Sequence, residues 1–149
     1  MVHNIFFCYE ALAYEKILGK WVLENRVDDF LNAFHIKNTV LTSQIISNKG
    51  PVIIEFSRDK TFEIIFQNDN NSYKISVRGI YSILNNVKPQ PITFSKITKI
   101  RGSRHFIIKI NSTKNNFTLS YGSIKKRLRP LSWSKDKFLR FNFISKSIS

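Results

Sequence analysis

The densest group of charged side chains in this sequence is the run Lys-Lys-Arg-Leu-Arg from Lys125 to Arg129. If this run forms a strand, Lys125, Arg127 and Arg129 share one face, because alternate residues of a strand point to the same side. An inward-facing set would suit a ligand with carboxylates, which guanidinium groups bind in a bidentate manner. The same set facing outward would contact phosphates. A solvated strand end is the third interpretation.

Aromatic side chains flank this basic run. Phe117 and Tyr121 precede it, and Trp133, next to Ser132, follows it. Flat rings beside cationic groups are typical of sites that hold a planar ligand, and equally of surfaces on which nucleic-acid bases stack. The sequence therefore predicts a binding site around this run and leaves the class of ligand open.

No other group of residues has the spacing of a known catalytic device. The single cysteine, Cys8, lies between aromatic residues, which indicates a buried thiol rather than a nucleophile. The adjacent pair Asp28-Asp29 is interpreted as the start of a helix. The motifs of serine hydrolases, phosphate loops and dinucleotide sites do not occur. The histidines are isolated, so no metal site is expected; they are His3, His35 and His105. An enzyme with this sequence would therefore act by holding a reactive ligand, without a tightly bound cofactor.

The charge is distributed unevenly along the chain. The formal net charge is +14. The residues after Tyr73 include only one acidic side chain, Asp136, and carry +16, whereas the residues up to Tyr73 carry −2. Such asymmetry favours an anionic partner: a nucleic acid, an acidic protein surface or a small molecule with several anionic groups. A solvated surface encoded by an AT-rich genome is the alternative, since Asn, Ile, Lys and Phe are abundant.

The length and the ends of the sequence bound its organisation. With 149 residues, the chain is expected to form one domain, 1–149, with a core of its own. The start lacks the features of a secretory signal or a transit peptide, so we expect a protein that works where it is made. No apolar run approaches the roughly 20 residues of a membrane-spanning helix.

The hydrophobic pattern predicts one good helix followed by many short strands. Apolar residues recur at helical spacing over 5–17, and Gly19 ends that segment. A second, short helix from Asp28 is possible, or else this segment is the far half of a long first strand. Gly79 interrupts one strand and is interpreted as a bulge or a barrel corner. The predicted strands span 40–47, 52–58, 61–67, 72–84, 92–100, 105–111 and 117–129, with one or two more near the end.

These eight to ten short strands predict an all-β, meandering antiparallel barrel of the lipocalin or fatty-acid-binding-protein type, with an N-terminal helix. The stretch Gly19-Lys20-Trp21 fits the opening of its first strand. Gly19 would let the chain turn sharply. Trp21 would plug the closed end of the barrel, with a hydrogen-bond partner for its indole N–H.

Four pieces of the sequence form a further pattern: Phe6-Phe7, Gly19-Lys20-Trp21, the segment around Arg127-Leu128-Arg129 with Ser132, and the ending Phe-Asn-Phe-Ile-Ser-Lys-Ser-Ile at 141–148. In these pieces the chain resembles the S-type (CpcS/CpeS) bilin lyases of phycobiliproteins. The resemblance implies a lipocalin-like barrel that binds an open-chain tetrapyrrole (bilin), such as phycocyanobilin or phycoerythrobilin. It also implies that the protein helps to attach the bilin to a cysteine of an apo-phycobiliprotein subunit. Because plastid-encoded members exist, it implies a location in the chloroplast.

The resemblance also implies roles for particular residues. Arg127 and Arg129 would hold the propionate carboxylates of the bilin. Trp21, Tyr121 and Trp133 would border the tetrapyrrole plane. Arg26 and Ser132 would make further polar contacts, and the basic second half of the chain would help to dock an acidic phycobiliprotein surface.

Two other classes of function stay open. An intracellular lipid or fatty-acid carrier has a related barrel, and the segment from Asp28 to Phe34 is similar to the helical segment after that family's first strand. The helix–turn–helix lid of such carriers is, however, not evident in the sequence. A basic RNA-binding or ribosomal protein is the other class, and the charge of the second half is its only support.

Overall fold

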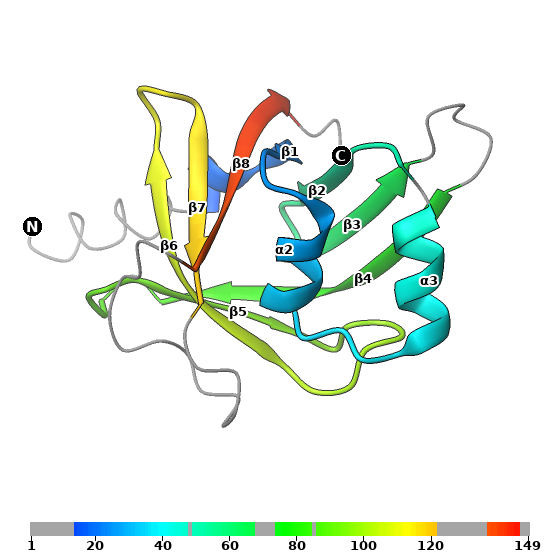
Figure 1. Cartoon of the computed structure of the whole chain (residues 1–149). Helices are drawn as coiled ribbons and strands as arrows, with labels where there is room; N and C mark the ends of the chain where they lie inside the picture. Colours follow the sequence, from blue (N-terminus) through cyan, green and yellow to red (C-terminus); the bar gives the residue numbers. More distant parts are fainter. Residues whose placement is uncertain (1–13, 48, 68–73, 85, 122–136, 147–149) are drawn as a thin grey trace, which may run out of the picture.

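The structure, a computed structural model, describes residues 14–47, 49–67, 74–84, 86–121 and 137–146. Within these ranges, eight antiparallel strands form a closed barrel in which each strand pairs with its neighbours along the chain and β8 pairs with β1 (Figure 1). The strands are β1 Gly19–Leu23, β2 Val52–Phe56, β3 Thr61–Gln67, β4 Lys74–Ile83, β5 Pro91–Ser95, β6 Arg104–Asn111, β7 Asn116–Ser120 and β8 Phe138–Ser145. The predicted all-β, lipocalin-like barrel is therefore confirmed.

Two helices lie between β1 and β2: α2, Val27–Ala33, and α3, Thr39–Ser47 (Figure 1). In a meander, alternate connections fall at the same end of the barrel. The two helices therefore share one end with the β5–β6 connection, and we call it the helical end. The opposite end carries the β2–β3 and β6–β7 turns. Of the predicted helix over 5–17, residues 14–17 are helical and the remainder lies outside the described residues.

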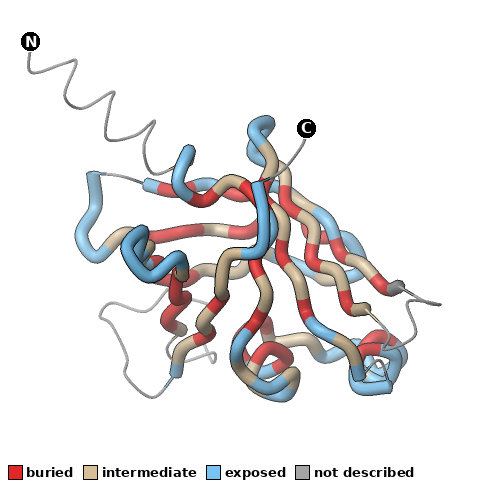
Figure 2. Tube along the Cα trace, turned by 90° about the horizontal axis from the view of Figure 1, so that it is seen from above, coloured by how far each residue is buried: buried red, intermediate tan, exposed pale blue. Residues whose placement is uncertain are grey.

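Alternating side chains explain why these segments form strands. Along β3, Phe62, Ile64 and Phe66 are buried while the residues between them are half-buried. Figure 2 shows the same alternation on neighbouring strands. Side chains that point inward on every second residue must fill the barrel, so the period of two in the sequence fixes which face each strand presents.

Two glycines lie where a side chain would collide with backbone. Gly19 has a φ of 117°, and a Cβ atom there would lie 2.4 Å from the carbonyl oxygen of Ser145. The prediction of a sharp turn at Gly19 is thus confirmed. A Cβ atom on Gly79 would lie 2.6 Å from the carbonyl oxygen of Ser95. The β3–β4 register runs through Gly79 without a slip and pairing with β5 begins at Ile80, so Gly79 is a barrel corner rather than a bulge.

The predicted strand over 40–47 is wrong, because this segment is helix α3. Its β-branched residues favoured a strand. Leu41 and Ile45, however, lie four residues apart and are both buried on one helix face, while Val40 is 66% exposed. The side chain of Asn38 accepts a hydrogen bond of 3.1 Å from the backbone N–H of Leu41, which caps the helix.

The predicted strand over 92–100 is also wrong in its second half. β5 ends at Ser95, and the chain then turns through Lys96 and Lys99, which have φ values of 51° and 65°. The segment from Asp28, for which a helix and a strand were both considered, forms helix α2.

Aromatic rings fill the barrel interior. Phe56 of β2 contacts Phe117 of β7 and Phe94 of β5, with ring centroids 5.8 and 6.2 Å apart. Neither of these strands is a neighbour of β2, so the rings meet across the barrel. Phe30 of α2 contacts Phe66 at 5.4 Å, and Phe34, the C-cap residue of α2, contacts Phe106 at 4.9 Å. Helix α2 thus seals the helical end with two rings.

Candidate functional site

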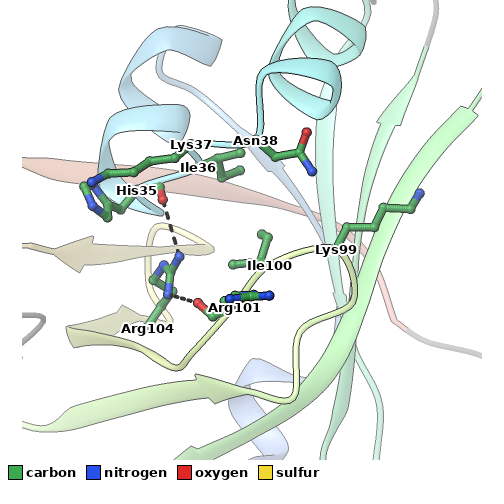
Figure 3. A pocket seen from close by; sticks show the side chains of 8 residues that line it. All are labelled: His35, Ile36, Lys37, Asn38, Lys99, Ile100, Arg101 and Arg104. Atoms are coloured by element: carbon green, nitrogen blue, oxygen red, sulfur yellow. Dashed lines mark hydrogen bonds between the residues drawn. The ribbon is translucent and has the colours of Figure 1, made fainter.

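A pocket of about 340 Å³ lies at the helical end, between the α2–α3 connection and the β5–β6 connection (Figure 3). We call it the basic pocket. Its volume is at the lower end of the range of about 300–1,000 Å³ in which small organic ligands are held. The lining residues are His35, Ile36, Lys37, Asn38, Lys99, Ile100, Arg101 and Arg104.

Arg104, the first residue of β6, joins the two walls of this pocket. Its guanidinium donates hydrogen bonds to the backbone carbonyls of Phe34 and His35 at the end of α2. It also donates to the carbonyl of Arg101, at 2.8 Å, in the opposite wall. A cation at the carboxyl end of a helix is favourable, because the last carbonyls of a helix carry partial negative charge. Arg104 is therefore a positioning residue that holds the α2 terminus against the β5–β6 connection.

The remaining cations of the pocket carry charge without a carboxylate partner. Lys37, Lys99 and Arg101 are exposed, and in the described ranges none of them forms an ion pair. The pocket lining includes no acidic side chain. Arginines elsewhere on the surface are neutralised, as in the pairs Arg58–Glu15 and Arg78–Glu63, each 2.9 Å. The positive charge of the pocket is therefore available to an anion.

Apolar side chains lie between these cations. Ile36 and Ile100 are half-buried, one in each wall, and in Figure 3 they point toward each other. The same view shows Lys37 and Lys99 extending to opposite sides of the opening. The site thus combines an apolar centre with cationic edges, which is the arrangement that suits an amphipathic anion.

Trp21 is the predicted site residue that the structure buries most deeply. It is 3% exposed, and its indole N–H donates a hydrogen bond of 2.8 Å to the carbonyl of Ile17. Its ring meets Phe117 and Phe143 edge-on. These contacts lie at the end of the barrel opposite the helices, so Trp21 has the plugging role that the sequence predicts. Its contact with a ligand stays a prediction.

Arg26 and Tyr121 lie at the helical end, beside the first turn of α2. Arg26 is the N-cap residue of α2, and its exposed guanidinium approaches Asp28 at 3.5 Å. Burial raises the pKa of Tyr121, and the nearby charge of Asp29 raises it further. The structure thus brings Arg26 and Tyr121 to one end of the molecule and does not bring either of them to Trp21.

The other predicted contacts lie outside the described residues: Arg127, Arg129, Ser132 and Trp133, with the whole Lys125–Arg129 run. The strand ends that flank this segment, Ser120 and Phe138, lie at the helical end, where they pair with each other. Whether the basic run faces inward stays a prediction.

Sequence reasoning missed the basic pocket. The signal was present as four basic residues without an acid between Lys96 and Arg104. A strand over 92–100 would place Lys96 and Lys99 on opposite faces, and Arg101 and Arg104 lie beyond that range. Lys37 could not be linked to them, because its position beside the β5–β6 connection depends on how α2 packs on the barrel.

Two negative findings concern the described residues. Within those ranges, no three His, Cys, Asp or Glu side chains come together as a metal ion would require. Of the helices in the same ranges, none has both the length and the apolar character needed to cross a bilayer.

His105, one of the isolated histidines of the sequence, has its Nδ1 atom 3.0 Å from the hydroxyl oxygen of Thr93 on the neighbouring strand.

Comparison of the chain with models of protein families, with curated proteins and with solved structures finds no match.

Proposed function

We propose that this protein is a bilin lyase: it binds an open-chain tetrapyrrole and presents it to a cysteine of a phycobiliprotein subunit. The observation that carries the proposal is the basic pocket, with its apolar centre, at the rim of a barrel whose interior is already filled by aromatic rings. A ligand held at the rim stays accessible to a second protein, and such access is what a transfer reaction needs. The resemblance of Gly19-Lys20-Trp21 and of the C-terminal segment to the lyases supports the same conclusion.

The reaction requires little chemistry from the lyase. The sulfur of the partner's cysteine adds to the exocyclic carbon of the ring-A ethylidene group, and the thiol hydrogen ends on the adjacent ring carbon. No group leaves, and no oxidant or reductant is consumed. The lyase accelerates this addition by orienting the bilin and by excluding other adducts, which is catalysis by positioning.

The charge distribution supports a protein partner of opposite sign. Exposed lysines such as Lys88 and Lys137 lie in the basic second half of the chain. An acidic phycobiliprotein surface would be attracted to them, which increases the rate of encounter.

A fatty-acid carrier is the second candidate, because the structure has the helix pair between β1 and β2 that the sequence did not reveal. Carriers of this type hold the lipid inside the barrel. Here, Phe56 meets both Phe94 and Phe117 across the interior. These rings occupy the part of the interior in which such carriers hold the lipid chain. The filled interior therefore favours a ligand at the rim.

The test is an absorbance titration of the purified protein with phycocyanobilin and with phycoerythrobilin, followed by addition of apo-phycobiliprotein subunits. We expect a saturable red shift and then a thioether adduct detected by mass spectrometry. The same titration with Arg127→Ala and Arg129→Ala tests the predicted role of the basic run. A smaller red shift in those variants would support that role.

No spectral change with either bilin would contradict the proposal. Binding of a fatty acid in its place would establish the carrier. Binding of RNA that weakens steeply between two salt concentrations would establish the nucleic-acid class.

A further inference from the structure

We infer that the basic pocket recognises two carboxylates of one organic ligand, with Lys37 engaging one of them and Lys99 with Arg101 engaging the other. The inference rests on the proposed function for the identity of the ligand as a bilin, whose two propionates are such a pair. The residues that carry it are distinct from the Lys125–Arg129 run.

The cations of the pocket come from its two walls. Lys37 comes from the α2–α3 connection, and Lys99 and Arg101 come from the β5–β6 connection. Arg104 fixes the walls against each other through its bonds to both. Lys37 and Lys99 are therefore held on opposite sides of one opening, as Figure 3 shows. Two separate anionic groups match this arrangement better than one.

The apolar centre distinguishes an organic dicarboxylate from a phosphate chain. Ile36 and Ile100 lie between the cationic edges. A nucleic-acid backbone would place charged phosphates and sugars against these isoleucines, which gains little from apolar burial. A pyrrole ring or an alkyl segment between two carboxylates would contact them favourably.

The pocket volume also matters for reactivity. About 340 Å³ encloses part of a four-ring bilin and leaves the rest outside. The propionates of a bilin are on its two central rings, whereas the ethylidene group is on the terminal ring A. Holding the central rings by their carboxylates would therefore leave ring A free to meet the partner's cysteine.

The experiment measures binding of biliverdin, a bilin without the reactive ethylidene group, by absorbance. The test variant is Lys37→Gln/Lys99→Gln. The matched control is Lys16→Gln/Lys114→Gln, which changes two exposed lysines at the opposite end of the barrel. Each double variant loses two positive charges from the total of +14, so nonspecific attraction is equal in both.

We expect the Kd for biliverdin to rise at least about tenfold in the test variant, since each substitution removes a charge-assisted hydrogen bond to a carboxylate. The control should change by no more than about twofold. Biliverdin dimethyl ester should bind the unsubstituted protein as weakly as biliverdin binds the test variant. Equal losses in both double variants, or undiminished binding of the ester, would overturn the inference.

A second pair of probes separates this inference from the proposed function. Dodecanedioic acid and dodecanoic acid differ by one carboxylate, and their binding is followed by the amide NMR shifts of Ile36 and Ile100. If no bilin binds but the diacid binds more tightly than the monoacid, and Lys37→Gln/Lys99→Gln removes the difference, the pocket assignment stands and the lyase proposal fails. If bilins bind and the test variant has no effect, the pocket assignment fails and the lyase proposal stands. If neither bilins nor the diacid bind, both are wrong.

Discussion

The barrel interior and the basic pocket lie within one small molecule and are built on opposite principles. In the interior, aromatic rings such as Phe56 and Phe117 meet across the barrel, and both are fully buried. In the pocket, Lys37, Lys99 and Arg101 are exposed, and none of them has a carboxylate partner among the described residues. The rings of the interior pack against one another, whereas the cations of the pocket are placed to receive an anionic group.

This contrast teaches where to look for function in a filled barrel. Lipocalin-type folds commonly hold a ligand in the interior, but here the same space provides the stability of the fold. Changes to the interior should therefore act on stability. Changes to the pocket should act on binding and leave stability nearly unchanged. Substitutions in the interior and in the pocket, and a rise in pH, test this division.

Phe117→Ala should destabilise the protein by about 3–5 kcal/mol, because it removes a ring that contacts Trp21, Phe56 and Phe141 in the core. Urea unfolding measures the change. Val40→Ala is the control: Val40 is 66% exposed on α3, and its change should stay within about 0.5 kcal/mol. A loss below about 1 kcal/mol for Phe117→Ala would mean that the interior is loosely packed.

Gly19→Ala should destabilise the barrel more than Gly79→Ala. Both substitutions place a Cβ atom against a backbone carbonyl, at 2.4 and 2.6 Å respectively, which costs about 1–3 kcal/mol by overpacking. Gly19 also has a φ of 117°, a conformation that adds about 1–3 kcal/mol for an alanine. Thermal unfolding of both variants checks the order. The reverse order would contradict the account of how β1 begins.

Stability should fall at alkaline pH partly through Tyr81. Burial raises the pKa of this phenol, and the neighbouring Tyr14 and Asp59 raise it further. The folded state therefore favours the neutral form. The stability that the folded protein gains from this preference is complete below the unfolded pKa of about 10. It is lost as the pH rises above that value, by up to about 1.4 kcal/mol per pH unit. Urea unfolding at pH 9 and pH 11 should show a smaller loss for Tyr81→Phe than for the unsubstituted protein. Equal losses of stability in the two proteins would show that Tyr81 does not cause the fall at alkaline pH.

Lys37→Gln/Lys99→Gln should change the free energy of unfolding by no more than about 0.5 kcal/mol, because both side chains are exposed and neither has an ion-pair partner in the described ranges. Slight stabilisation is consistent with the account, since like charges are removed. Urea unfolding of this variant beside Phe117→Ala measures the division directly. A loss above about 2 kcal/mol would show that these lysines have a structural role.

The sequence predicted the barrel well and the pocket poorly, for physical reasons. The period of two in segments such as 61–67 is a local property, so strand β3 and its inward face could be predicted without knowing the rest of the fold. Gly19 and Trp21 were likewise interpretable from their own chemistry. Helix α3 could not be predicted in this way, because Leu41 and Ile45 become a buried face only when the helix packs on the barrel.

The pocket depends on contacts between segments that are far apart in the sequence. Arg104 bonds to the carbonyls of Phe34 and His35, about 70 positions earlier in the chain. A charge pattern alone cannot predict such a contact. The basic run at Lys125–Arg129 was more conspicuous in the sequence because its residues are consecutive, and its role in binding stays a prediction.

The most direct test of the central claim, that the ligand binds at the rim and not inside, is an NMR titration with biliverdin in which the methyl signals of isoleucines are observed. Ile36 and Ile100 line the basic pocket, whereas Ile54 and Ile108 are buried in the barrel. We predict saturable shifts for Ile36 and Ile100 and almost none for Ile54 and Ile108. Shifts confined to Ile54 and Ile108 would contradict the account and would place the ligand within the barrel.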